Sequence, residues 1–273
     1  MGDTERGSRY SNVLELLRSH LLADLPHGFT TRSGGRSVAP FDSLNLGDRV
    51  EDAPETVAEN WRLLEQAAGL GFARVRQVHG ARVVVAAGPA LPREEADGLV
   101  SSIPGLAACV AVADCVPILL ARPDGSAVAA LHAGWRGTLA RIAAVGVRSL
   151  AGQAGGEPPL AVIGPSIGPC CYQVAADLAA RFTASFGPGV IRPGPRGPHL
   201  DLWAANQLTL LEAGVTRLAV VRRCTACEPR HFFSHRRDGV RTGRMVGFIA
   251  PSPISAGRRS LTQAGSDLEF PRS

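Results

Sequence analysis

The sequence predicts an α+β fold, in which a single domain contains a mixed β-sheet flanked by helices. Apolar segments of strand length occur in two settings: as neighbours around the turn at Pro123–Gly125, and singly between segments with helical periodicity. This combination is typical of a sheet with both antiparallel and parallel pairs. Of the 273 residues, 45% are hydrophobic and 19% are charged, which is sufficient for a full core.

Four segments have the spacing and the end signals of helices. In the first, Asp52 and Glu55 form a predicted capping box, Pro54 falls in the first turn and Gly69 follows the last residue. In the second, Thr138 is the predicted N-cap, and apolar residues then recur at helical spacing. The four predicted helices cover residues 52–68, 138–150, 174–186 and 201–214.

Seven apolar segments are predicted as strands, and two of them form a hairpin around Pro123–Gly125. If this turn centres between its first two residues, Cys115 lies directly opposite His132, with Cβ atoms about 4.5–5.5 Å apart. If it centres one residue later, the two are diagonal neighbours and still close. The segment 187–198 is rich in Gly and Pro and is predicted as a surface loop. The predicted strands are 73–79, 82–87, 106–115, 126–132, 160–164, 217–222 and 245–250.

The two ends of the chain differ in composition from its centre. Residues 1–24 are predicted as a peripheral segment, 25–250 as the folded domain and 251–273 as a disordered tail, because the tail is polar and lacks periodicity. The sequence has no apolar run near the roughly 20 residues that span a bilayer, and no pattern of a secretory signal. We therefore expect a cytoplasmic protein without membrane partners.

Arginine alone carries the positive charge. The chain contains no lysine, which excludes a lysine Schiff base and a phosphate-binding lysine of the Walker type. The net charge of +5 is modest and most arginines are scattered, so we expect no nucleic-acid partner. One concentrated segment suits a compact anion better than a nucleic-acid backbone, and it contains Arg222, Arg223, Arg230, Arg236, Arg237, Arg241 and Arg244.

Three potential metal ligands, His79, Cys115 and His132, lie at predicted strand ends. Two imidazoles and one thiolate suit the intermediate softness of zinc. Three protein ligands would leave a fourth position for water, whose pKa falls to about 7 on the metal. The alternative is ordinary packing, which is the usual role of an isolated His or Cys in an apolar segment.

A second group of ligand types consists of Cys224, Cys227, His231 and His235. Only three residues separate its two pairs, whereas a zinc finger has about twelve. We therefore expect packed thiols beside an arginine-rich loop in preference to structural zinc. A redox Cys-x-x-Cys stays open, although the usual βαβ context is lacking. All six cysteines are expected as thiols, because the composition is that of an ordinary core protein.

Several motifs occur in a fixed order between about residues 26 and 250: HGFTTRSGG, SLNLG, QVHG, EADG, ADCVP, HAGWRGT, IGPSIGPCCYQV and CTACEPRHFFSHRRDGVRTGRM. Together they resemble the YfiH-like family, first labelled multicopper polyphenol oxidase or laccase-like. The family was later described as zinc-dependent purine nucleoside phosphorylase with adenosine deaminase activity. The resemblance implies an α+β fold with a mixed sheet, and metal ligands at His79, Cys115 and His132. His235 departs from the family pattern, in which a tyrosine is expected.

The implied substrates are phosphate and the nucleosides adenosine, inosine, guanosine and S-methyl-5′-thioadenosine. For deamination, zinc-activated water would attack C6 of adenine while a carboxyl group, from Asp97 or Asp114, carries protons. Asp114 could instead orient a metal ligand. Phosphorolysis requires arginines that bind phosphate through forked hydrogen bonds. The candidates for substrate or phosphate binding are Arg32, Arg136, Arg236, Arg237 and Arg244.

Three other functions stay open at the level of sequence. Copper-dependent polyphenol oxidation would place copper at the same ligands, although seven histidines are few for several copper centres. An amidase that edits peptidoglycan precursors would use the metal, or Cys115 as nucleophile with His132 as base. A binding protein without catalysis would use the arginine-rich segment. The sequence does not predict the oligomeric state.

Overall fold

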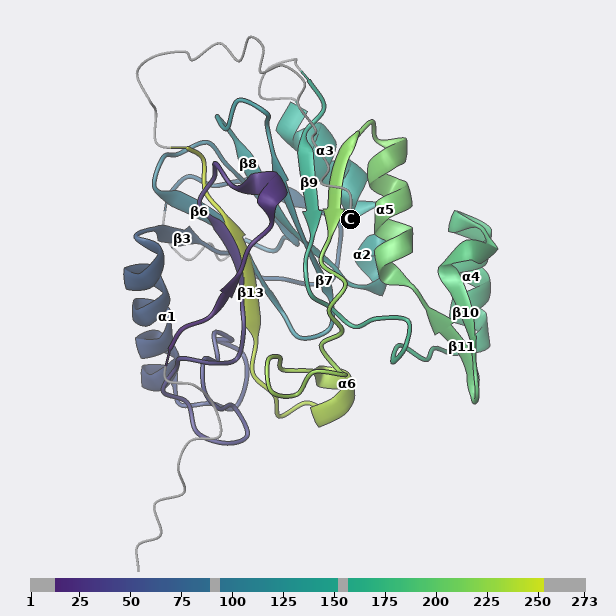
Figure 1. Ribbon diagram of the computed structural model, residues 1–273, viewed down its shortest axis with the longest axis horizontal. Coiled ribbons are helices and arrows are strands. Elements are labelled where there is room, and N and C mark those ends of the chain that lie inside the picture. Colours follow the sequence, from purple (N-terminus) through teal and green to yellow (C-terminus); the bar gives the residue numbers. More distant parts are fainter. Residues whose placement is uncertain (1–12, 89–93, 152–156, 253–273) are drawn as a thin grey trace, which may run out of the picture.

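The computed structural model describes residues 13–88, 94–151 and 157–252, which form two packed β-sheets with helices on both outer sides (Figure 1). In the five-stranded sheet the order is β1-β2-β13-β6-β3, and only the β3–β6 pair is parallel. Its strands are β1 (Leu16–Leu17), β2 (His27–Thr30), β3 (Gly71–Ala73), β6 (Leu106–Val112) and β13 (Met245–Ile249).

The six-stranded sheet has the order β12-β9-β7-β8-β5-β4. Its outermost pairs, β12–β9 and β5–β4, are parallel, and the inner pairs are antiparallel. The predicted mixed α+β fold is therefore confirmed, although its strands divide between two sheets. The strands are β4 (Val83–Val85), β5 (Gly98–Ser101), β7 (Val116–Ala121), β8 (Val128–Ala133), β9 (Leu160–Ile163) and β12 (Arg217–Val220).

Helices cover the outer face of each sheet. The helix α1 (Pro54–Ala68) packs on the five-stranded sheet, at the left of Figure 1, while α3 and α5 pack on the six-stranded sheet. The hairpin β10–β11 pairs by itself beside α4. The remaining elements are η1 (His20–Leu22), α2 (Trp135–Leu139), α3 (Ile142–Ala151), α4 (Ala176–Phe186), η2 (Pro188–Val190), β10 (Ile191–Gly194), β11 (Gly197–Leu200), α5 (Leu202–Glu212) and α6 (His235–Asp238).

Alternating side chains of the central strands fill two separate apolar layers. On β7, Ile118 and Leu120 pack toward the helices, whereas Leu119 and Ala121 pack between the sheets. Every residue of β7 and β8 is buried, which agrees with the uninterrupted apolar sequence of both strands. By the same alternation, His132 near the end of β8 faces the space between the sheets.

The chain passes from one sheet to the other at residues 113–115. β6 ends at Val112 in the five-stranded sheet, and β7 begins at Val116 in the six-stranded sheet. Between them Asp114 has a φ of 90°, in the region that favours glycine, and its carbonyl accepts a hydrogen bond from the amide of Ile167 at 2.9 Å. The prediction of one strand over 106–115 is wrong at its end, because this turn is needed to change layers.

Two predicted helix starts are wrong for physical reasons. α1 begins at Pro54 without a side-chain cap, because the Asp52 carboxylate instead accepts hydrogen bonds from Ser37 and Asn45. Thr138 is buried inside α2, where its hydroxyl accepts a hydrogen bond from Asn206. The other end signals are confirmed: Gly69 ends α1 in the left-handed conformation, and Asp201 caps α5 by accepting from the amide of Ala204.

The segment 187–198 is not the predicted loop, since it contains η2 and most of the β10–β11 hairpin. Its glycines and prolines obscure the strand pattern. Much of the predicted peripheral segment and tail lies outside the described residues. Of the described part, β1 pairs with β2 and Leu22 is buried in the core. Among the described helices, none is both long and apolar enough to cross a membrane.

Candidate metal centre

Three side chains from distant parts of the chain converge at one end of the space between the sheets. Their ligand atoms, from His79, Cys115 and His132, all lie within 4.8 Å of one another. The imidazole rings of His79 and His132 have centroids 4.8 Å apart and are almost perpendicular, at 79°. His79 has a φ of 62°, an uncommon conformation for a residue with a side chain. The predicted convergence of these three residues is therefore present in the structure.

The hairpin register explains how Cys115 and His132 meet. Pro117 pairs with His132 and Val116 with Ala133, so the turn centres one residue later than the first of the two expected registers. Cys115 therefore lies diagonally from His132 and next to Gly134. A Cβ atom at Gly134 would lie 3.0 Å from the Cys115 sulfur and 3.1 Å from a ring carbon of His79. The glycine of the HAGW motif thus leaves room for two of the ligands.

The buried carboxylate of Asp97 organises this centre. Its Oδ1 accepts hydrogen bonds from Nδ1 of His132 and from the amide of His79, both at 2.8 Å. Its Oδ2 accepts from the amides of Gly80 at 2.6 Å and Val78 at 3.2 Å. Because Nδ1 of His132 is engaged in this way, Nε2 is the ring nitrogen that is left to face the centre.

Charge coupling within the centre changes the protonation of Cys115 and His132. Burial opposes ionisation of the Cys115 thiol, but His132 and His79 outweigh it and lower the pKa of Cys115 to about 6. Burial likewise opposes protonation of His132, but the Cys115 thiolate and Asp97 raise the pKa of His132 to about 9. Without a metal, the two side chains therefore form a thiolate–imidazolium pair at neutral pH.

This donor set fits a metal ion of intermediate softness. A thiolate and two imidazoles, one of them oriented by a carboxylate, make up the ligands of an open three-residue site. Cys115 is already a thiolate at neutral pH, which is the form that binds a metal, whereas His132 must lose a proton before it can bind one. The same donors suit zinc or copper, so the ligand types indicate a metal without fixing which one.

A cavity of about 560 Å³ opens beside the centre and is lined by all three ligands. This volume falls within the range of small-molecule sites, which is about 300–1,000 Å³. Asp114 also lines the cavity, and its carboxylate accepts hydrogen bonds from the Thr225 hydroxyl and the Arg236 amide, both at 2.6 Å. Asp97 does not line the cavity, because its side chain is fully buried behind His132, to which it is hydrogen-bonded.

Of the five predicted anion-binding arginines, Arg136, Arg236 and Arg244 line the cavity. Arg136 stacks on Trp135, with its guanidinium carbon 4.4 Å from the ring centroid. Arg236 lies 4.9 Å from the Tyr172 centroid and donates to the carbonyls of Cys171 and Gln173. Burial lowers the pKa of Arg244, whose side chain donates to the carbonyls of Thr242 and Gly243.

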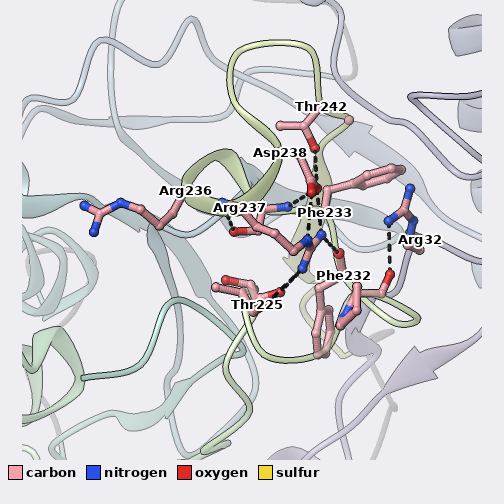
Figure 2. A network of polar contacts seen from close by, with 12 residues as sticks. Arg32, Thr225, Phe232, Phe233, Arg236, Arg237, Asp238 and Thr242 are labelled. Atoms are coloured by element: carbon pink, nitrogen blue, oxygen red, sulfur yellow. Dashed lines mark hydrogen bonds and ion pairs between the residues drawn. The ribbon is translucent and has the colours of Figure 1, made fainter. Parts of the chain in front are cut away.

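The structure does not place Arg32 and Arg237 at the cavity. The guanidinium of Arg237 donates to the carbonyls of Thr225, Ala226 and Phe232 and to both carboxylate oxygens of Asp238 (Figure 2). Arg32 donates to the carbonyls of Asp42 and Pro229 and stacks on Phe233. Both arginines therefore hold loops together, while Arg236 extends away from this network in Figure 2.

Several lining residues were not predicted from the sequence. Arg49, Arg74 and Arg76 add positive charge, and Trp135 and Tyr172 add aromatic surface. Trp135 and Tyr172 belong to the HAGWRGT and IGPSIGPCCYQV motifs, so their place in these motifs could have identified them as residues of the cavity wall. The arginines at 74 and 76 precede His79 in an apolar segment, which gave no such signal. His235 lies in the lining as well.

The second group of potential ligand types in the sequence, Cys224, Cys227, His231 and His235, does not come together as one cluster. Cys224 and Cys227 lie with Cys170 and Cys171, and the four sulfur atoms are all within 4.8 Å of one another. His231 and His235 do not belong to this group; His231 lies 3.6 Å from Glu228, and His235 lines the cavity. Among the described residues, every cysteine is a free thiol, as predicted.

Comparison with known proteins agrees with these features. A family model described as multi-copper polyphenol oxidoreductase laccase matches residues 26–252. The chain belongs to this family. The match covers His79, Cys115 and His132 and both cysteine pairs, and it confirms the resemblance to YfiH-like proteins that the motifs indicate.

Relatives within the family have related sequences over most of their length. The chain is 44% identical to a purine nucleoside phosphorylase of Deinococcus radiodurans, over 86% of this chain and 92% of the relative. It is 38% identical to the purine nucleoside phosphorylase YfiH of Escherichia coli, over 81% and 91%. The crystal structure of YlmD from Geobacillus stearothermophilus superposes with a TM-score of 0.80 at 35% identity, covering 87% of this chain and 96% of that one.

Replacing Asp97 with Asn tests its organising role. We expect metal affinity at the centre to fall about 10- to 100-fold, because His132 loses its charged partner. The free energy of unfolding should also fall by about 1–3 kcal/mol, since an amide NH₂ group would face backbone N–H donors. Chelator competition and urea denaturation measure the two effects. Asp24→Asn, at an exposed position, is the control, and unchanged metal affinity in Asp97→Asn would contradict the assignment.

The thiols of the metal-free protein should differ in their pH dependence. Because the thiolate is the reactive form, alkylation of Cys115 should be near its maximum at pH 7 and fall about tenfold per pH unit below pH 6. Burial raises the pKa of Cys109 to about 12, so Cys109 should react slowly throughout this range. Peptide mapping after pulses of iodoacetamide gives both rates. A Cys115 midpoint near the ordinary value of about 8.5 would contradict the thiolate–imidazolium pair.

Proposed function

We propose that the chain is a zinc-dependent purine nucleoside phosphorylase that also deaminates adenosine. The observation that carries this proposal is that three side chains able to hold a metal ion lie in the wall of an arginine-lined cavity. The names of the relatives support it, because those from D. radiodurans and E. coli are called purine nucleoside phosphorylases. The proposed substrates are phosphate with adenosine, inosine, guanosine or S-methyl-5′-thioadenosine.

The cavity offers separate partners for the parts of these substrates. Trp135 and Tyr172 present aromatic faces of the kind on which a purine stacks. Arg136 and Arg236 are each held against one of these rings, so their guanidinium groups are oriented before an anion binds. Arg244, in the loop that precedes β13, adds a third cation to the cavity wall. We assign phosphate binding to these three arginines and leave Arg32 and Arg237 as loop supports.

In phosphorolysis a phosphate oxygen forms a bond to C1′ of the ribose, and the bond between C1′ and N9 breaks. The purine leaves with the bonding electrons and takes up a proton. The positive charge of the arginines offsets the negative charge of phosphate, and their hydrogen bonds orient the phosphate for attack on C1′. Asp114 lines the cavity and is our candidate for holding or moving protons there, while Asp97 positions His132.

Bound at His79, Cys115 and His132, zinc would supply a Lewis acid with an open position for activating water. For deamination, water adds to C6 of adenine and ammonia leaves. Asp114 would accept a proton from the water and return it to the departing amino group. The hydrogen bonds from the Thr225 hydroxyl and the Arg236 amide hold the Asp114 carboxylate in a fixed position at the cavity.

A second candidate function is amide hydrolysis, as in an editing amidase for peptidoglycan precursors. The observation in its favour is the thiolate–imidazolium pair of Cys115 and His132, which is an arrangement for nucleophilic catalysis. This reaction would proceed without metal. Copper-dependent polyphenol oxidation is the third candidate, and it rests on the family description alone.

A single experiment separates the three candidates. Wild type and Cys115→Ala are loaded with zinc or copper, their metal content is measured, and each is incubated with inosine plus phosphate, adenosine, a muramoyl peptide or a phenol. We expect zinc-loaded wild type to release hypoxanthine from inosine and ammonia from adenosine, and Cys115→Ala to hold one zinc per chain fewer than wild type and to lose both activities. Peptide hydrolysis by the chelated protein would favour the amidase, and phenol oxidation with copper the oxidase. Full nucleoside turnover by metal-depleted Cys115→Ala would refute the proposal.

The role of Arg136 can be tested by replacing it with Ala. Loss of a charge-assisted hydrogen-bonding partner of phosphate should raise the KM for phosphate about 10- to 100-fold, with less effect on the KM for inosine. Steady-state kinetics with each substrate varied in turn gives both values. Arg148→Ala, at an exposed position on α3, is the matched control. An unchanged KM for phosphate would remove Arg136 from this role.

A further inference from the structure

Four cysteines outside the metal centre form a compact cluster that the proposed function does not use. Cys170 and Cys171 come from the loop after β9, and Cys224 and Cys227 from the loop after β12. β9 and β12 are parallel neighbours, so their carboxyl ends lie at the same edge of the sheet. A parallel bridge between Ser166 and Cys224 continues this pairing beyond both strands. The topology therefore brings the two loops together next to the cavity.

The spacing of the sulfur atoms matches a tetrahedral metal site. Zinc–sulfur bonds of about 2.3 Å place the corners of a tetrahedron about 3.8 Å apart. The Cys227 sulfur lies 3.3 Å from that of Cys171 and 3.5 Å from that of Cys170, and all four sulfurs are within 4.8 Å of one another. A disulfide would require about 2.05 Å. Both distances lie within about 0.5 Å of the tetrahedral value, and both exceed the length of a disulfide bond.

Without a metal the surroundings favour a thiolate at Cys224, where burial is outweighed by backbone hydrogen bonds that lower the pKa, whereas burial and the neighbouring sulfurs raise the pKa of Cys170 and of Cys171. The amide of Gly168 donates a hydrogen bond to the Cys224 sulfur at 3.2 Å. Arg236 donates to the carbonyl of Cys171, and Arg237 to the carbonyls of Thr225 and Ala226 inside the Cys-x-x-Cys loop. Backbone donors and nearby cations of this kind offset the negative charge of a thiolate-rich metal site.

Ordinary packing does not explain the cluster. Cys224 is buried, but Cys170 and Cys227 are exposed and Cys171 is only partly covered. Exposed thiols in mutual contact are a liability to oxidation unless they share a ligand. The Cys-x-x-Cys spacing is common in structural zinc sites, and an adjacent cysteine pair supplies the two ligands that the 224–235 segment lacks.

We propose that Cys170, Cys171, Cys224 and Cys227 bind a second metal ion, a structural zinc in a four-thiolate site. On binding, the thiols lose their protons and four Zn–S bonds form, which leaves no open position for a substrate. The ion would fix the loop that carries Tyr172 to the loop that carries Thr225, the hydrogen-bond donor to Asp114. It would therefore act as a support for one wall of the cavity. This proposal does not depend on the proposed function.

Metal counting on matched variants tests the proposal. Purified wild type, Cys115→Ala, Cys224→Ser/Cys227→Ser and the control Cys109→Ala are analysed for zinc by mass spectrometry after metal loading and desalting. We expect Cys224→Ser/Cys227→Ser to hold one zinc per chain fewer than wild type and the control. Cys115→Ala should keep the second zinc. If only the centre at Cys115 fails to bind, wild type and Cys115→Ala both hold one zinc, so the two proposals fail separately.

A spectroscopic measurement covers the case in which the double variant does not fold. Cobalt added to metal-free Cys115→Ala should give an intense sulfur-to-cobalt charge-transfer band and the visible bands of tetrahedral cobalt, both reduced in Cys115→Ala/Cys170→Ser. Thiol titration of the denatured, chelated wild type should find all six cysteines reduced. Zinc content unaffected by the Cys224→Ser/Cys227→Ser change, absence of the cobalt bands, or fewer than six thiols would overturn the proposal.

Discussion

The arrangement of His79, Cys115 and His132 depends on the hydrogen bonds to the buried carboxylate of Asp97. One oxygen joins the His132 ring to the His79 backbone, and the other binds the next amide along the chain. An ionised group without exposure is tolerated only when its hydrogen bonds are satisfied, and here four donors converge on it. The same contacts hold His79 in its uncommon backbone conformation, so ligand position and loop conformation are fixed together.

The change of sheet at residues 113–115 connects this centre to the rest of the cavity. Because β7 begins at Val116, Cys115 lies just outside the β7–β8 pairing, close to His132 of β8. The preceding residue, Asp114, is anchored from the opposite side by Thr225 and Arg236. Thr225 lies between Cys224 and Cys227, so its hydrogen bond to the Asp114 carboxylate joins this loop of the four-cysteine cluster to the residue that precedes Cys115.

The arginines of this chain divide between two physical roles. Some, such as Arg237, donate all of their N–H groups to carbonyls and carboxylates of neighbouring loops. These loop carbonyls have no partner in regular secondary structure, and the arginine supplies one. Others, such as Arg136 and Arg236, line the cavity and stack on an aromatic ring of its wall. Sequence position does not distinguish the two, because Arg236 and Arg237 are adjacent and yet take different roles (Figure 2).

The sequence by itself determined the features that follow from local rules. The strand β8, the caps at Gly69 and Asp201, and the motifs that carry the candidate ligands could be identified, because turn chemistry, periodicity and family motifs act over a few residues. Only the tertiary structure decided the sheet change at Asp114, the role of Asp97 and the union of Cys170 and Cys171 with Cys224 and Cys227. These features depend on which strands become neighbours, and that is set by packing across the whole chain and not by spacing within it.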